Sequence, residues 1–272
     1  MQLQRTISAS FVLCAMAVVA SAQAANAKYS APLPQATLIQ IMKAEDERRW
    51  DDSLKSLLSG NDPAVRKRAA LAAGRIGVEA AVPVLAEMLL QDREAEVREM
   101  AAFALGEIES AGGAYALVTV VKDPNKPARA RSVEALGKIA AGLAGATTTQ
   151  PGADKQEDDR LDLIKAAILE ALRFEDSRRS NPDRLAILLG LTAVLRTRPH
   201  GAGPLVAKFL DYSDRLIVAT ALNTMARLRM KDANDRVRQL LKDGDPMCAR
   251  TRRASSGRRS IRKRSMICSL KP

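Results

Sequence analysis

A thirteen-residue pattern occurs three times along the chain at an almost constant spacing. Arginine stands second, glycine tenth and isoleucine twelfth in each copy, so Arg66, Arg98 and Arg129 are equivalent and lie 32 and then 31 residues apart. Self-similarity with a period in this range is typical of arrays in which identical supersecondary units stack on one another. The copies are 65–77 (VRKRAALAAGRIG), 97–109 (VREMAAFALGEIE) and 128–140 (ARARSVEALGKIA).

The composition indicates that the repeated unit is helical. Apolar residues make up 47% of the chain but aromatic residues only 3%, so the apolar content is mainly Ala, Leu, Val and Ile. Ala and Leu favour helices, and the alternating patterns that mark strands are absent. The sequence therefore predicts an all-α fold, an α-solenoid of stacked helix pairs with a period of about 31 residues.

Each unit is predicted to be a helix, a turn and a second helix that contains the repeated pattern. In the first copy, Asp62-Pro63 is a helix-start signal and Gly77 a helix-stop signal. Val65 and Ile76 lie on the stripe that we expect to face the interior. Because a helix pair alone cannot bury its apolar face, the units must stack.

Changes in pattern along the chain suggest six parts. Helical patterning stops at a small, polar and acidic stretch that we expect to be a flexible loop. It resumes in diverged repeats, where Val218 replaces the repeated arginine. The parts are 1–27 signal peptide, 28–44 linker and start of a capping helix, 45–142 repeats, 143–160 flexible loop, 161–246 diverged repeats, and 247–272 basic non-periodic tail.

The first 27 residues have the pattern of a secretory signal peptide. Arg5 gives a short basic start, residues 7–20 are apolar or small, and small-x-small cleavage sites end at Ala22 and Ala27. The apolar run is short for a membrane span, so an uncleaved anchor is the weaker alternative. We expect an exported protein, periplasmic or extracellular, with no stable membrane anchor after signal removal.

The net charge of +12 is concentrated in the tail, where 247–272 holds nine basic residues and no acidic one. The part of the chain between the leader and the tail is nearly neutral, and we therefore expect it to bind no nucleic acid. Asp245-Pro246 occupies a helix-start position, but the repeat pattern ends there. Reading the codons of Met247-Cys248-Ala249 two bases later gives Val followed by Arg or Cys at the position where the repeat has Val-Arg, which favours an out-of-frame tail over a genuine basic tail.

The residues that usually carry catalysis or bind metals are scarce. The cysteines are Cys14 in the leader and Cys248 and Cys268 in the tail, so the body offers no thiolate site. His200 is the only histidine and is expected to be a solvated loop residue, whereas Trp50, the only tryptophan, is expected to pack against the core. We expect no metal, no cofactor and no catalysis by this chain itself.

The repeats resemble HEAT repeats, especially the short bacterial type called PBS-lyase HEAT-like repeats. The resembling features are the D-P-x-V-R turn and the A-L-G-x-I ending, over residues 51–141 well and 161–246 more loosely. The resemblance implies a concave surface for a protein partner. The opening KAEDERRWDDSLKSLL is also similar to exported bacterial proteins that join HEAT repeats to a cyclophilin-type peptidyl-prolyl isomerase domain. A truncated portion of such an isomerase and a bilin-lyase-like repeat protein are therefore the alternatives to a binding scaffold.

The candidate partner surface consists of charged residues that change from copy to copy while the interior positions stay alike. Their functional interpretation is contact with a protein partner of unnamed identity. The plainer interpretation is a ladder of ion pairs between repeats, each contributing little stability. The candidates are Lys67, Arg68, Arg75, Glu99, Glu107, Arg131 and Lys138, and in the first copy we expect Arg66 to project outward with them.

Overall fold

The structure is a computed structural model that describes residues 33–147 and 155–242. The predicted signal peptide, the tail with its reading-frame hypothesis, and all three cysteines lie outside the described residues. The chain divides into two units, Met1–Gln40 and Ile41–Pro272. The first includes the start of helix α2 (Gln35–Asp46), and the second holds the repeats.

Helices account for all regular structure in the described ranges, which contain no strand. Each unit of the array places a first helix before a second helix, as the repeat predicts. The first helices are α3 (Asp52–Leu58), α5 (Val82–Gln91), α7 (Ala114–Thr119), α9 (Lys155–Ser177), α11 (Gly203–Lys208) and α13 (Asn234–Lys242). The second helices are α4 (Pro63–Ile76), α6 (Ala95–Ile108), α8 (Lys126–Thr147), α10 (Arg184–Thr197) and α12 (Arg215–Leu228). Short 3₁₀ turns η1 (Glu79–Ala81), η2 (Ala111–Gly113) and η3 (Phe209–Asp211) join some of them.

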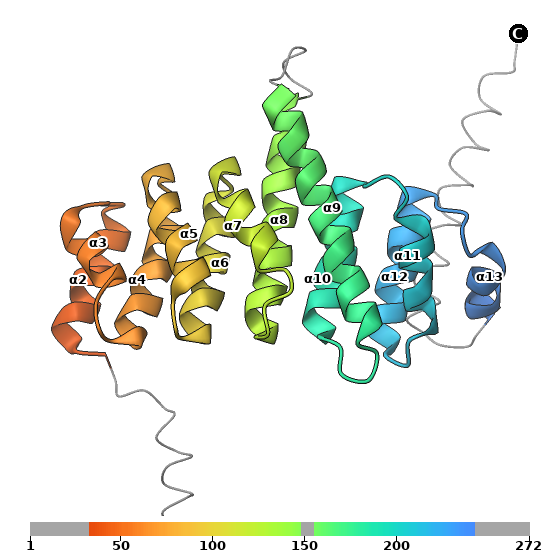
Figure 1. The fold of residues 1–272 in the computed structure, drawn as a ribbon, viewed down its shortest axis with the longest axis horizontal. Helices are drawn as coiled ribbons and strands as arrows, with labels where there is room; N and C mark the ends of the chain where they lie inside the picture. The colour runs from red at the N-terminus through yellow and green to blue at the C-terminus, as the bar shows by residue number, and fades with distance from the viewer. Residues whose placement is uncertain (1–32, 148–154, 243–272) are drawn as a thin grey trace, which may run out of the picture. The chain divides into compact units, whose positions relative to one another are not determined.

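Within the unit Ile41–Pro272, the second helices pack side by side in the order α4, α6, α8, α10, α12 (Figure 1). The first helices α5, α7, α9 and α11 form a second layer, in which each also contacts the next. Leucines at the interface of the two layers, such as Leu85, Leu105 and Leu136, are almost wholly buried. The predicted all-α solenoid of stacked helix pairs is confirmed.

The repeated glycine lies where neighbouring second helices come closest. A Cβ atom on Gly74 would lie 2.7 Å from the Cα atom of Ala104, and one on Gly106 would lie 2.8 Å from the Cβ atom of Ala135. Real Cβ atoms are not found at such distances, so the backbones approach closely only because glycine faces alanine. The period in the sequence is thus the period of helix–helix contact.

Helix ends follow the signals expected from the sequence. The side chain of Asp62 accepts a hydrogen bond from the N–H of Ala64 and caps α4. Gly77 ends the same helix with a φ of 74°, and its N–H donates to the carbonyl of Ala73. A φ in this region favours glycine, which has no Cβ atom.

The helices around the predicted loop are longer than expected. Helix α8 continues to Thr147 and α9 begins at Lys155, so both ends of the segment 143–160 are helical, and residues 148–154 lie outside the described residues. Ala and Leu at the end of α8 and Lys, Gln and Glu at the start of α9 are good helix formers. Local propensity therefore carries both helices further than the change in composition indicates.

Candidate functional site

The repeated arginine joins the turns of neighbouring units. Arg66 donates from Nε and Nη2 to the two carboxylate oxygens of Asp92, at 2.8 and 2.9 Å, and from Nη1 to the carbonyls of Gly60 and Asn61. Its side chain is only 15% exposed. The expectation that Arg66 projects outward is therefore wrong, because the acidic turn of the next unit draws the guanidinium inward.

The same contact recurs along the array with one change of partner. Arg98 pairs with Asp123 at 3.2 and 3.3 Å, while Arg129 donates to Glu175 on α9 at 2.8 Å. Arg129 is fully buried and Glu175 nearly so. The next two second helices carry no such arginine: Ile187 and Val218, both buried, take its position, so the series ends after α8.

The first three candidate residues form ion pairs between helices rather than facing solvent freely. Arg68 and Arg75 on α4 both donate to Glu45 near the end of α2, at 2.5 and 2.6 Å. Lys67 donates to Glu96 on α6 at 2.6 Å. These contacts link α4 to α2 and to α6.

The other four candidates meet between α6 and α8. Lys138 donates to Glu107 at 2.6 Å, and Arg131 lies 3.7 Å from Glu99. Both cations lie over the ring of Phe103, at 5.5 Å for Arg131 and 5.4 Å for Lys138. All seven candidates thus take part in a ladder of ion pairs that runs from α2 to α8, the plainer of the two interpretations of the sequence.

The ladder holds its carboxylates in the charged form. A hydrogen bond from Lys67 lowers the pKa of Glu96. Burial raises the pKa of Asp92, but hydrogen bonds from Arg66 and from the N–H of Glu94 outweigh this effect, so the net pKa is lowered. Glu45 behaves in the same way, since its two arginine partners outweigh its burial and the pKa falls below its ordinary value.

The surface formed by the second helices continues onto α10 and α12, but the ladder of ion pairs does not. The positions equivalent to the ladder residues are mostly uncharged there, and the cations that remain lie at the helix ends. Arg196, Arg198, Arg227 and Arg229 form no ion pair or side-chain hydrogen bond within residues 33–147 and 155–242. Sequence reasoning missed these residues, although Arg196-Thr197-Arg198 and Arg227-Leu228-Arg229 repeat one pattern 31 residues apart.

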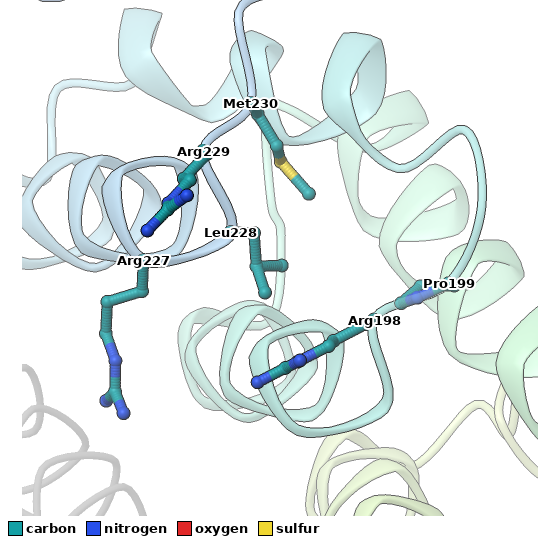
Figure 2. A pocket seen from close by; sticks show the side chains of 6 residues that line it. All are labelled: Arg198, Pro199, Arg227, Leu228, Arg229 and Met230. Atoms are coloured by element: carbon teal, nitrogen blue, oxygen red, sulfur yellow. The ribbon is translucent and has the colours of Figure 1, made fainter.

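These helix ends surround a pocket of about 460 Å³. Arg198, Arg227 and Arg229 are exposed, whereas Leu228 and Met230 are half-buried and Pro199 is buried. In Figure 2, Leu228 lies between the end of α12 and the turn after α10, and the guanidinium groups extend from the two helix ends. A second pocket has a volume of about 470 Å³. Arg66 and Asp92 line it and already form an ion pair with each other.

The remaining residues singled out in the sequence have structural surroundings. Trp50 is half-buried against the core, as expected, with the ammonium of Lys55 5.9 Å from its ring centre. His200 is exposed in the turn after α10, also as expected. Within the described ranges, no group of three His, Cys, Asp or Glu side chains is placed to hold a metal ion. No helix there combines the length and the apolar character needed to cross a membrane.

Comparisons with known proteins agree with the observed architecture. The family model for HEAT repeats matches residues 27–104 and 85–173. The complex of CpcE and CpcF of phycocyanin lyase from Nostoc sp. PCC7120 is similar, with a TM-score of 0.52 and 18% identity over 74% of this chain and 73% of that chain. An engineered protein matches with a TM-score of 0.43 and 20% identity over 78% of this chain and 98% of that chain. No curated protein matches the chain.

Proposed function

Because the chain belongs to the HEAT-repeat family, whose model covers residues 27–104 and 85–173, we propose that it is an exported scaffold that binds a protein partner and performs no catalysis itself. The stacked second helices present one continuous row of side chains for such a partner. Arrays of this kind commonly bind other proteins along extended surfaces of this sort. The proposal assigns the partner to the C-terminal end of that row.

One observation carries this assignment: the charged side chains of the row are paired on α4, α6 and α8, whereas Arg196 near the end of α10 and Arg227 near the end of α12 have no ion pair among the described residues. Lys67, Arg131 and Lys138 already have carboxylate partners within the array. Arg196 and Arg227 have none among the described residues. An acidic partner gains most by contacting the unpaired cations, because it breaks no existing ion pair there.

Site-specific photo-crosslinking in the cells that make the protein tests this assignment. A crosslinking amino acid is placed at Asn223, which is exposed on α12, and in a matched variant at Tyr115, which is 60% exposed on the first helix α7. We expect Asn223 to yield one crosslinked species of defined mass and Tyr115 to yield none. Equal yields from both positions, or crosslinking from Tyr115 alone, would contradict the proposed binding face.

Export is a separate part of the proposal and rests on the leader pattern in residues 1–27. Mass spectrometry of the protein recovered from the envelope and medium fractions should give a new N-terminus after Ala22 or Ala27. If the protein were recovered from the soluble cell interior with its leader still attached, export would be contradicted.

The likeness to the phycocyanin lyase complex supports the repeat architecture and nothing more, because an identity of 18% is evidence of a shared fold alone. Bilin attachment is therefore not proposed for this chain. A chromophore absorbance acquired on co-expression with bilin-producing enzymes would reopen that alternative.

A further inference from the structure

We propose that the pocket at the ends of α10 and α12 binds an acidic segment of the protein partner, with carboxylates on Arg198, Arg227 and Arg229 and an apolar side chain on Leu228 and Met230. This inference rests on the proposed scaffold function and names the chemistry of its partner. The pocket measures about 460 Å³, which is room for two or three side chains rather than a whole domain.

The array places two copies of one arginine motif side by side. Arg198 follows α10 and Arg229 follows α12 at equivalent positions, and both residues are exposed. Arg227 lies in the last turn of α12 and lines the same pocket. Stacking of neighbouring units therefore converts a pattern with a period of 31 residues into a group of three arginine side chains that line one pocket (Figure 2).

The charge of the pocket arginines is not balanced as it is in the preceding units. The arginines of the preceding units are neutralised by Asp92, Asp123 and Glu175. The three pocket arginines have no carboxylate partner within the described residues. Carbonyl groups at the two helix ends offset this positive charge only in part, because a helix end carries about half an elementary charge. The cluster therefore favours an anionic ligand.

Two of the pocket arginines have an unusual backbone conformation. Arg198 and Arg229 have φ angles of 49° and 57°, in the left-handed region, where the first unit of the array has Gly77. A side chain is disfavoured at such a position, and residues kept there against local preference are common at functional sites. Glu109 occupies the equivalent position after α6, with a φ of 57°, and provides a control that lacks the positive charge.

The apolar part of the pocket selects a peptide over a simple anion. Guanidinium groups bind carboxylates through paired hydrogen bonds, and they bind phosphate equally well. Leu228 and Met230 are half-buried beside them and can cover an apolar side chain, for which the flexible thioether of methionine is well suited. A segment that alternates acidic and apolar residues satisfies both parts of the pocket.

Fluorescence anisotropy with the full chain tests the proposal. The probe is a labelled, terminally blocked peptide of alternating Glu and Leu, compared with peptides in which Gln replaces Glu or Ser replaces Leu. We expect Arg227→Gln to weaken binding of the Glu-Leu peptide about tenfold or more. Arg93→Gln, which removes an exposed charge elsewhere on the array, should leave binding unchanged. The basic segment 247–272 is present in every variant and adds the same background.

Glycine substitutions separate binding from folding. Arg198→Gly and Arg229→Gly should raise the thermal unfolding midpoint, because glycine suits a positive φ, and should still weaken peptide binding about tenfold. Glu109→Gly should raise the midpoint in the same way and leave binding unchanged. A loss of binding in the stabilised variants cannot then be attributed to misfolding.

Three results would overturn the inference. They are equal affinity for the Gln and Glu peptides, equal affinity for the Ser and Leu peptides with full competition by millimolar inorganic phosphate, and unchanged affinity in the arginine variants. The outcome of the crosslinking experiment at Asn223 does not depend on any of these three results. The scaffold function can therefore survive the failure of this pocket, and failure of that function is detected separately.

Discussion

An alanine at position 106 would place its methyl group 2.8 Å from the Cβ atom and 2.9 Å from the Cα atom of Ala135. Relief requires α6 and α8 to move apart. We expect Gly106→Ala to lower the free energy of unfolding by about 1–3 kcal/mol, the usual cost of overpacking. Denaturant unfolding followed by circular dichroism measures this difference.

Gly142→Ala is the matched control for that substitution. Gly142 also lies within a second helix, α8, but is exposed, with its nearest side-chain atom 3.8 Å away on Glu109. Alanine there should stabilise the protein by about 0.5–1 kcal/mol through helix propensity. If both substitutions had the same sign, close helix contact would not explain the repeated glycine.

Glu175 compensates the buried charge of Arg129 and also accepts a hydrogen bond from the N–H of Asp183. Glu175→Gln leaves the arginine buried without a counter-charge, and we expect a loss of about 3–5 kcal/mol in unfolding free energy. Glu170→Gln removes the carboxylate of an exposed pair with Lys122 and should cost less than about 1 kcal/mol. Chemical denaturation of the two variants gives the comparison, and similar losses would contradict the role assigned to burial.

At the scale of elements, the sequence was sufficient to predict the helices but not their contacts. Periodicity located the second helices because their alanines and leucines recur at helical spacing, and Gly77 and Asp62 marked the helix ends correctly. The alignment of the repeats also indicated that Val218 replaces the repeated arginine. It could not show that Arg66 turns toward Asp92, because an arginine on a helix is most often solvated and the partner is 26 residues away.

The candidate site was predictable only in part, for a related reason. The seven charged candidates were identified from their variation between copies, yet only the structure shows that each has an oppositely charged partner. The arginine motif at 198 and 229 was overlooked because the repeat was weakest there. Its significance depends on the stacking of α10 against α12, a contact that a single sequence does not display.

The contact between turns makes its own prediction. Arg66→Gln and Asp92→Asn should each cost about 2 kcal/mol, because each leaves a charged partner that is largely buried. The double variant should cost clearly less than the sum, since both members of the pair are then gone. A double-mutant cycle by urea unfolding measures the coupling, and strictly additive losses would show that the two side chains stabilise the fold independently.

At the scale of the whole molecule, the ion pairs predict how stability depends on pH. The pKa values of Glu45, Asp92, Glu96 and Asp214 are lowered in the folded state below the ordinary values of 4.5 for Glu and 3.8 for Asp. Folding therefore favours their charged forms, and the resulting stability is present above about pH 4.5 and lost as the pH falls further. The midpoint temperature of thermal unfolding should be nearly constant from pH 7 to 5 and should fall steeply below pH 5. Asp92→Asn should make that decline shallower, and an unchanged pH profile would show that this pair does not contribute.

In this account the paired cations of α4 and α8 stabilise the array, whereas the cations at the ends of α10 and α12, which have no ion pair within residues 33–147 and 155–242, do not. Thermal unfolding of two triple variants tests it directly, since each removes three positive charges from the same row. Replacement of Lys67, Arg131 and Lys138 by glutamine should lower the midpoint by a few degrees, corresponding to about 1–2 kcal/mol in all. Replacement of Arg196, Arg227 and Arg229 should leave the midpoint unchanged or raise it. Equal losses in the two variants would contradict the division of the row into a stabilising part and a binding part.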